Sequence, residues 1–545
     1  MQTTSSAELI RHLAHRGLDR VFLVPGESYL GIMDALYDNP SISTNICRHE
    51  SGAGFMAVSD AKLTGRPALV CVSRGPGLTN ASIALHTAQQ DAVPLICVIG
   101  QVPAADVRKG AFQEIDYQLM LGGICKRVIE IREAADFVRA ANTAWDVAME
   151  GTPGPVAIVI PEDLQDIEME QCPLVQSNTH RPALSKGDLE ALQRAVAEAR
   201  RPVIIAGGQM ETDAGRAALH ELATSLGAPV LISFRRQHAI DFSHPHYCGE
   251  LGLAPSPQVL QALTEADCIL ALGTRLGDIC SQGYTLFDHM PATQTLWHLS
   301  QHLEDYRHRH PDMRRLAVDP VDAAKRIVAT GVTSEHRADW LGRFQAMHKA
   351  HTTISEWKHE ESSVDFRCAP SLVRKHIQGR ANVVVDAGTF AAPFYRYLQT
   401  SEDVRLLSPL SGAMGFGVPG AIAAALREPA RKTICLCGDG GFMMTGNEIA
   451  LAVQRNLNIL FIVSNNSCYA SIRIHQERFY PGRVVGTDLF NPRFDMIAHA
   501  WNIPGRCVRT AEDFDNTLAE LMPLDGPALI EVATSLSAVL PAPRP

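Results

Sequence analysis

The chain has 545 residues, and its 46% hydrophobic and 20% charged content is typical of a globular protein with about three domains. A formal net charge of −10 argues against a nucleic-acid-binding protein, which needs basic faces to neutralise phosphates. The chain contains no run of about 18 apolar residues, so no membrane-spanning helix is predicted. The first residues lack the apolar stretch of a signal peptide. Thirteen cysteines without framework spacing predict reduced core residues and a cytoplasmic protein.

Short apolar segments alternate with helical stretches in the first part of the chain. DRVFLV (19–24), PALVCVS (67–73) and PLICVIG (94–100) each precede a turn that contains Pro or Gly. Their continuous apolar character predicts strands that are buried on both faces, as in a parallel sheet. Their alternation with helices predicts βαβ units. We expect a first α/β domain over residues 1–170.

Two polar stretches divide the rest of the chain. After the first, RPVIIAGG (201–208) begins a second α/β series, which predicts a middle domain over residues 185–330. After the second, ANVVVDAG (381–388) begins a third series, which predicts a domain over residues 366–545. A helical linker is expected between them. The sequence thus predicts three doubly wound parallel-sheet domains.

The strongest functional pattern is TICLCGDGGFMMTGNEIALAVQRNLNILFIVSNN, residues 433–466. An apolar strand ends at Asp439, a helix with apolar residues at helical spacing follows, and a second apolar strand ends at Asn466. Parallel sheets bind ligands at the carboxyl ends of their strands, so both polar side chains are expected at one site. A GDG alone is common in turns, whereas its combination with the Asn pair is specific.

The chemistry of this segment suits a diphosphate–metal complex. Gly440 and Gly441 allow phosphate oxygens to approach backbone N–H groups at a helix start. Asp439 and the amide oxygen of Asn466 are hard ligands for Mg²⁺ or another divalent cation, which takes its other ligands from phosphates and water. A backbone carbonyl near Cys468 is expected to complete the protein's share.

This pattern resembles the thiamine diphosphate signature, GDG followed by NN across a strand–helix–strand unit. Further segments resemble the acetolactate synthase-like family of 2-oxo acid decarboxylases and carboligases and cover nearly the whole chain: RHESGAGFMA (48–57), GPGLTN (75–80), GQVP (100–103), AFQE (111–114) and GAMGFGVP (412–419). The resemblance implies that the first domain binds the pyrimidine and the third the diphosphate. It also implies that two subunits build each site, so a homodimer at least, and a homotetramer, is expected.

The resemblance assigns further site residues. Glu50 matches the carboxyl group that hydrogen-bonds N1′ of the pyrimidine and so promotes loss of the C2 proton. Such a group must be poised between acid and base. Met414 matches the residue that lies beneath the bent cofactor. Other expected cofactor contacts are Asn80, Thr389, Gly412 and Tyr469.

Two more side chains are expected at the reacting end of the cofactor. Gln113 belongs to the AFQE match. Glu27 stands where related synthases usually have Gly and pyruvate decarboxylases have Asp, and an ionisable group there suits proton transfer. The alternative for Glu27 is a place in a cluster at a helix N-terminus. We therefore name Glu50, Gln113 and Glu27 as candidate catalytic residues.

Two segments depart from the family pattern. Authentic acetolactate synthases carry a Gln-Trp pair that helps select the acceptor, and Ile474 and His475 stand there in this chain. The acceptor is therefore left open. The segment RLGDICSQG (275–283) differs from the family's flavin-binding segment, so bound FAD is doubtful. Gly207 and Gly208 are compatible with a nucleotide or with a plain turn.

The favoured interpretation is a thiamine diphosphate- and Mg²⁺-dependent enzyme that decarboxylates a small 2-oxo acid, with or without carboligation. The alternative is a 2-hydroxyacyl-CoA lyase or oxalyl-CoA decarboxylase type of enzyme. Basic residues that suit an acyl-CoA diphosphate, or a solvated basic face, are Arg235-Arg236, residues 307–310 and Arg314-Arg315. A third possibility, a non-catalytic homologue, is disfavoured because Glu50, Asp439 and Asn466 occur together.

Overall fold

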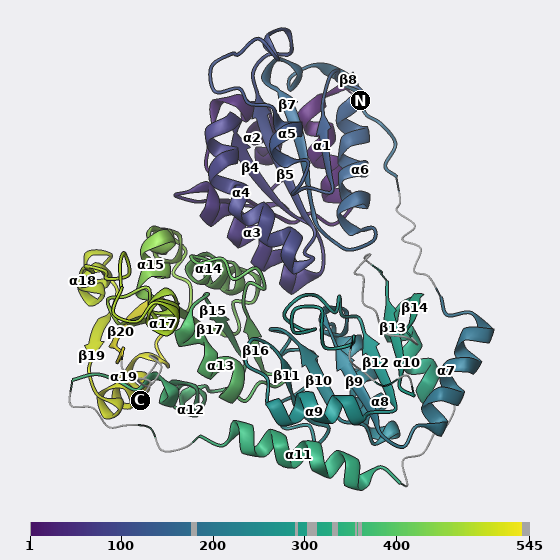
Figure 1. Cartoon of the computed structure of the whole chain (residues 1–545). Helices are drawn as coiled ribbons and strands as arrows, with labels where there is room; N and C mark the ends of the chain where they lie inside the picture. The colour runs from purple at the N-terminus through teal and green to yellow at the C-terminus, as the bar shows by residue number, and fades with distance from the viewer. Residues whose placement is uncertain are drawn as a thin grey trace.

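The computed structural model describes residues 2–175, 183–288, 291, 293–301, 303, 313–329, 336–354, 357 and 362–536. Three six-stranded sheets follow one another along the chain, each in its own domain (Figure 1). Neighbouring strands within each sheet are parallel, and helices connect them, which confirms the predicted fold class. The domain boundaries given above stay predictions. Among the described residues, no helix has both the length and the apolar character needed to cross a membrane.

The first domain contains β2 (Arg20–Leu23), β3 (Ser43–Ile46), β4 (Ala68–Ser73), β5 (Leu95–Gln101), β6 (Arg127–Glu130) and β7 (Pro155–Pro161), with β1 (Gln2–Thr4) paired to β8 (Glu168–Glu170). Its helices are α1 (Ser5–His15), α2 (Leu30–Tyr37), α3 (Glu50–Thr64), α4 (Arg74–Asp91), α5 (Tyr117–Leu121) and α6 (Asp136–Met149). The sheet order is β3-β2-β4-β5-β7-β6. The three apolar segments predicted as strands are β2, β4 and β5, so those predictions are confirmed.

The middle domain contains β9 (Pro202–Ala206), β10 (Val230–Ser233), β11 (Tyr247–Leu251), β12 (Cys268–Leu272), β13 (Thr295–Ser300) and β14 (Met313–Ala317). Its helices are α7 (Lys186–Glu198), α8 (Asp213–Leu226), α9 (Pro257–Glu265) and α10 (Pro320–Val328). The sheet order is β11-β10-β9-β12-β13-β14. Every residue of β9 and β12 is buried, as their continuous apolar sequences predict. The expected linker helix is α11 (Ala338–Thr352), which runs along the lower edge of Figure 1.

The third domain contains β15 (Ala381–Val385), β16 (Val404–Leu407), β17 (Lys432–Gly438), β18 (Ile459–Asn465), β19 (Gly505–Val508) and β20 (Ala528–Ala533). Its helices are α12 (Ala369–His376), α13 (Ala392–Tyr397), α14 (Gly417–Arg427), α15 (Asp439–Thr445), α16 (Ile449–Gln454), α17 (Ala470–Phe479), α18 (Phe494–Ala500) and α19 (Ala511–Leu521). The sheet order is β16-β15-β17-β18-β20-β19.

The helix expected after the GDG segment differs from the prediction. It consists of α15 and α16, which are separated by a 3₁₀ turn, η7 (Gly446–Glu448). A glycine inside a helix lowers its stability, and here it begins the 3₁₀ turn. The last residue of the turn, Glu448, is fully buried and contacts the first domain.

Helices α3 and α14 pack against each other and join the first domain to the third (Figure 1). Phe55 on α3 meets Phe416 edge to face, with ring centroids 5.8 Å apart. The Ser59 hydroxyl donates a hydrogen bond to the Gly420 carbonyl at 2.9 Å. One hydrophobic core runs through both domains across this contact.

All three domains meet at Asp91, the last residue of α4. Its carboxylate accepts hydrogen bonds from the backbone N–H groups of Leu410 (2.9 Å) and Ser411 (3.0 Å) in the third domain. Its backbone carbonyl accepts one from Arg236 of the middle domain at 3.1 Å. Arg275, also of the middle domain, donates to the preceding carbonyl at 2.9 Å. The C-terminal end of α4 is therefore held by both other domains.

Candidate functional site

The ends of two neighbouring strands bring Asp439 and Asn466 to one edge of the third sheet. β17 and β18 are parallel, with Gly438 opposite Ser464 in the register. Asp439 is the first residue of α15, and Asn466 follows the last residue of β18. This common edge is the carboxyl edge, where α/β sheets bind ligands.

Asp439 is a buried carboxyl group at the start of α15. Its Oδ1 accepts a hydrogen bond from the Gly440 N–H at 2.9 Å, and its Oδ2 accepts one from Asn491 Nδ2 at 2.8 Å. Burial raises the pKa of Asp439 above its ordinary value. A cation next to this carboxylate would favour its charged form, so the environment suits a metal ligand.

Asn466 and Cys468 lie in the turn after β18. Asn466 Oδ1 accepts a hydrogen bond from the Cys468 N–H at 3.0 Å, and the Cys468 carbonyl accepts one from Ala470 N–H at 2.8 Å. Each oxygen retains a lone pair for a second partner. With Asp439 they form an all-oxygen donor set that contains one carboxylate. Within the described ranges, no group of three or more His, Cys, Asp or Glu residues could hold a metal. A cation bound by these three oxygens would complete its coordination with oxygens of phosphate or water.

Asn491 is a site residue that sequence reasoning missed. Its amide nitrogen donates hydrogen bonds to Asp439 Oδ2 (2.8 Å) and to Asn465 Oδ1 (3.0 Å), so it bridges the ends of β17 and β18. The residue lies outside helices and strands, just before α18. No motif marks it, because its partners come from segments that precede it by 52 and 26 positions.

The two glycines after Asp439 are required by their neighbours in the structure. A Cβ on Gly440 would lie 2.5 Å from the ring of Tyr469, and one on Gly441 would lie 2.4 Å from Oδ2 of Asp386. Such distances force a shift of the neighbouring side chain. The backbone of α15 thus stays close to Tyr469, which the sequence names as a cofactor contact.

The buried carboxyl group of Asp386 fixes the loop that carries Met414. It accepts hydrogen bonds from the N–H groups of Gly415 (3.0 Å) and Phe416 (3.2 Å). Thr445 at the end of α15 donates to the Gly415 carbonyl at 2.8 Å. Burial raises the pKa of Asp386 to about 6, and the N–H donors oppose that rise.

The remaining expected cofactor contacts of the third domain lie at the same edge of the sheet. Thr389 follows β15 and is half-buried, and Gly412 follows β16 with φ at 70°. Strands β15 and β17 are paired with each other in the sheet, so Thr389 and Asp439 follow the ends of adjacent strands. Gly412 is suited to its position because a left-handed backbone costs glycine no steric penalty.

Glu50 is the first residue of α3, and its side chain is half-buried. Asn80 on α4 donates a hydrogen bond to Glu50 Oε2 at 2.9 Å. A Cβ on Gly77 would lie 3.5 Å from the other carboxylate oxygen, Oε1, which is an ordinary van der Waals contact. Glu50, which the resemblance assigns to the pyrimidine, therefore contacts Asn80, an expected cofactor contact.

Glu27 and Gln113 lie at the carboxyl edge of the first sheet, after β2 and β5, and both are exposed. Gln113 has a left-handed backbone (φ 66°), and its carbonyl accepts a hydrogen bond from the Gly75 N–H at 2.9 Å. A non-glycine residue held in this region stores strain, which occurs at functional sites more than elsewhere. The neighbouring strand ends thus place Glu27, Glu50 and Gln113 on one face of the domain.

Within one chain, the two groups of candidate residues belong to different domains. No hydrogen bond or ion pair between described residues joins Glu50, Asn80, Glu27 or Gln113 to Asp439 or Asn466. The first and third domains instead meet through buried side chains, chief among them Glu448.

The middle domain differs from the expectation of a solvated basic face at Arg235-Arg236. Arg235 is buried, lies over the Tyr395 ring with its guanidinium 4.9 Å from the centroid, and donates to the Pro409 carbonyl. Arg236 lies over Gly208, where a Cβ would come 2.7 Å from the guanidinium carbon. Local sequence cannot show this, because the partners are distant in the chain, and those of Arg235 belong to the third domain. Residues 307–310 lie outside the described ranges.

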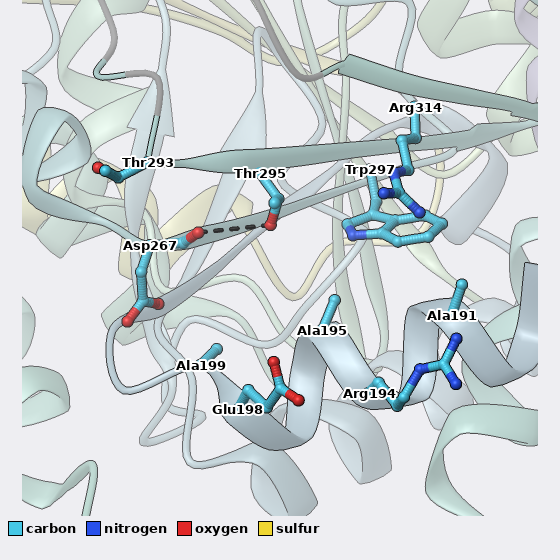
Figure 2. Close-up of a pocket in the computed structure, with 10 residues that line it drawn as sticks. All are labelled: Ala191, Arg194, Ala195, Glu198, Ala199, Asp267, Thr293, Thr295, Trp297 and Arg314. Atoms are coloured by element: carbon cyan, nitrogen blue, oxygen red, sulfur yellow. Dashed lines mark hydrogen bonds between the residues drawn. The ribbon is translucent and has the colours of Figure 1, made fainter.

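A cavity of about 410 Å³ lies at the opposite, amino edge of the middle sheet (Figure 2). Asp267 precedes β12, and its carbonyl accepts a hydrogen bond from the Thr295 hydroxyl at 3.4 Å. Arg314 lies over the Trp297 ring at 4.8 Å. Because α/β sheets bind ligands at the carboxyl edge, this cavity is not part of the candidate site.

Three family models match successive parts of the chain. They describe the N-terminal TPP binding domain (residues 3–120), the central domain (189–327) and the C-terminal TPP binding domain (386–532) of thiamine pyrophosphate enzymes. Thiamine pyrophosphate is another name for thiamine diphosphate.

Similar proteins extend over nearly the full chain. The acetolactate synthase isozyme 1 large subunit of Escherichia coli K12 is 30% identical over 546 residues, which is 97% of this chain and 93% of that one. The acetolactate synthase large subunit of Lactococcus lactis is 30% identical over 98% and 93% of the two chains. Among solved structures, the thiamine diphosphate-dependent 4-hydroxybenzoylformate decarboxylase of Rhodococcus jostii RHA1 superimposes with a TM-score of 0.83 at 25% identity, over 98% and 99%.

Proposed function

The chain belongs to the thiamine diphosphate-dependent enzymes of the acetolactate synthase-like family, and we propose that it decarboxylates a small 2-oxo acid, with or without ligation to an acceptor. Relatives named for acetolactate synthesis and for decarboxylation of an aromatic 2-oxo acid support this substrate class. The observation that carries the proposal is the placement of Asp439 and Asn466 at adjacent strand ends in the third domain, in a chain whose first domain presents Glu50.

We assign the metal and the diphosphate to the third domain. Asp439, Asn466 and the Cys468 carbonyl would hold Mg²⁺ or another divalent cation, and their oxygen chemistry supports this. Gly440 and Gly441 would present backbone N–H groups to the diphosphate. Further contacts with the cofactor would come from Thr389, Gly412, Met414 and Tyr469.

Thiamine diphosphate supplies an acidic C2–H group, whose loss gives a nucleophile for carbonyl carbons. Glu50 would hold a proton at N1′ of the pyrimidine, and the hydrogen bond from Asn80 orients the carboxyl group for it. Gln113 and Glu27 are exposed at the same domain edge, where they would bind the substrate and move a proton to or from it. We assign no role to a flavin.

The experiment that tests the proposal measures carbon dioxide release from a panel of 2-oxo acids by purified protein with thiamine diphosphate and Mg²⁺. Glu50→Gln should reduce the rate by about 10²–10⁴-fold, the range of general acid–base contributions. Analysis of the products separates simple decarboxylation from ligation. Failure to turn over any 2-oxo acid, together with cleavage of a 2-hydroxyacyl-CoA, would favour the alternative function.

We also propose that the chain assembles at least into a homodimer, and further into a homotetramer, and that it is located in the cytoplasm. The family resemblance, in which two subunits build each site, supports this proposal, and no hydrogen bond between described residues links Glu50 to Asp439 within one chain. Exposed apolar side chains on α15, namely Met443 and Met444, are 53% and 50% exposed and are suited to an interface. All thirteen cysteines are free, which supports a reducing compartment.

A further inference from the structure

We propose that Glu448, from the third domain, is a positioning residue that fixes Glu50 in the first domain of the same chain. The inference rests on the proposed function, in which Glu50 acts on the pyrimidine. Glu448 touches neither the substrate nor the cofactor in this proposal. It acts through the backbone that leads into α3.

The carboxylate of Glu448 accepts hydrogen bonds from the backbone N–H groups of the two residues that directly precede Glu50. The Arg48 N–H donates to both carboxylate oxygens, at 3.0 Å and 3.1 Å, and the His49 N–H donates to Oε1 at 2.9 Å. Both residues precede α3, whose N-cap is His49, so their N–H groups find no acceptor in the helix itself. A carboxylate that accepts several N–H groups forms strong, charge-assisted hydrogen bonds. The start of α3 is thus held by a side chain of another domain.

The packing around Glu448 leaves it little freedom. Its side chain is fully buried, and a Cβ on Gly52 would lie 2.4 Å from Oε1. Glycine is therefore the residue type that position 52 requires, because any side chain there would keep the first turn of α3 away from this carboxyl group. Burial raises the pKa of Glu448 to about 7, and the charge of Glu50 adds to that rise. A carboxyl group in this environment is retained at a cost in stability, which its contact with Arg48 and His49 offsets in part.

A second interdomain contact at the other end of α3 provides a matched control. Asp60 is buried there and accepts hydrogen bonds from Arg427 of α14 at 2.8 Å and 2.7 Å. Asp60 and Glu448 are both buried carboxyl groups at the same interface, but only Glu448 contacts the backbone next to Glu50. A purely structural role predicts equal effects when either group is removed.

The first measurement needs no cofactor. Amide hydrogen exchange in cofactor-free protein, read by mass spectrometry over residues 47–53, should be faster in Glu448→Ala than in the unaltered protein. Asp60→Ala should leave this segment unchanged. Gly52→Ala should also accelerate exchange, because the added methyl group displaces Glu448 while removing none of its atoms. This variant keeps the test available if Glu448→Ala does not fold.

The second measurement is exchange of the C2 proton in protein loaded with thiamine diphosphate and Mg²⁺, quenched in acid and read by NMR. Glu448→Ala should slow exchange by about 10–100-fold, since a misplacement of about 1 Å costs up to about 10²-fold. Asp60→Ala should stay within about threefold of the unaltered protein, and Glu448→Gln, which keeps an acceptor oxygen, should recover most of the rate.

The outcomes separate this inference from the proposed function. If Glu50→Gln slows C2 exchange but Glu448→Ala and Asp60→Ala behave alike, the positioning role is wrong and the assignment of Glu50 stands. If Glu50→Gln exchanges as fast as the unaltered protein, the assignment of Glu50 fails, and the inference fails with it. Slow exchange in Glu448→Ala, with recovery in Glu448→Gln and a normal rate in Asp60→Ala, supports the positioning role.

Discussion

Single residues at the third domain's strand ends combine several demands. Burial raises the pKa of Asp439, yet the group must be a charged carboxylate to bind a cation. Asn491 donates a hydrogen bond to Oδ2 at 2.8 Å, and a carboxylate has further lone pairs that a cation could use. The site therefore holds its carboxylate in place through neutral donors.

Removal of Asp439 should abolish binding of metal and cofactor together. Asp439→Ala lacks the sole carboxylate of the proposed donor set, and the diphosphate shares its ligands with the cation. Equilibrium dialysis with thiamine diphosphate and Mg²⁺ should show loss of both. Asp525→Ala, which changes an exposed carboxylate of the same domain, should bind both normally. Full cofactor binding by metal-free Asp439→Ala would refute the shared ligation.

Gly441 should tolerate no side chain. In Gly441→Ala the methyl group would meet the Asp386 carboxylate at 2.4 Å, and overpacking of this kind costs about 1–3 kcal/mol. The thermal unfolding midpoint should fall accordingly. Gly123→Ala is the control, because a Cβ there meets nothing within 4 Å. Equal midpoints for the two variants would show that the Asp386 loop yields to the added group.

The elements show what sequence alone could establish. The strands β17 and β18 are confirmed as predicted, since each is a short, continuous apolar run bounded by turn residues. Their ends also place Asp439 and Asn466 close together without knowledge of any other part of the chain. The break between α15 and α16 was not predicted, because the apolar residues that indicated the helix, Ile449, Ala452 and Val453, all follow Gly446.

Residues whose role depends on distant partners could not be found in this way. Asp386, Glu448 and Asn491 are ordinary polar residues in the sequence, and each acquires its role from a group in another segment or domain. Hydrophobic periodicity describes one element at a time and contains no information on such pairings. The family resemblance supplied Glu50 for the same reason, as no local pattern marks it.

The end of β11 should make the stability of the protein dependent on pH. Burial raises the pKa of Glu250 to about 7, against hydrogen bonds from the Arg235 N–H (2.6 Å) and Gln237 (3.0 Å). Between its ordinary pKa and pH 7 the folded state holds a proton that the unfolded state has lost. The free energy of unfolding should therefore fall as the pH rises through this range.

Glu250→Gln cannot ionise, so its free energy of unfolding should decline less between pH 5 and pH 8 than that of the unaltered protein. Chemical denaturation of cofactor-free protein at several pH values measures this difference. Glu265→Gln serves as the control, because Glu265 has a pKa below its ordinary value and titrates at lower pH. Parallel pH profiles for Glu250→Gln and the unaltered protein would contradict the prediction.

At the scale of the whole molecule, the placement of the two residue groups in different domains leads to a mixing experiment. If Glu50 of one subunit works with Asp439 of another, a dimer of one Glu50→Gln chain and one Asp439→Ala chain contains one intact site. Co-expression of both inactive variants should then restore activity, to about a quarter of the unaltered level for random dimers. Mixing either variant with a chain that carries both changes should restore none. Inactive mixed dimers, isolated through two affinity tags, would show that each chain builds its own site.

The meeting of three domains at Asp91 limits how the chain can be recombined. Domain boundaries commonly fall in linkers, where few contacts cross from one domain to the next. Here a transplanted middle domain would have to bring an arginine to each of the two carbonyls at the end of α4, as Arg236 and Arg275 do. A chimaera without these two arginines would lose the contacts between the middle domain and the end of α4. Asp91, the last residue of α4, would then hold Leu410 and Ser411 less firmly, and with them the loop that reaches Met414. The border suitable for grafting is therefore set by these contacts and not by the linkers.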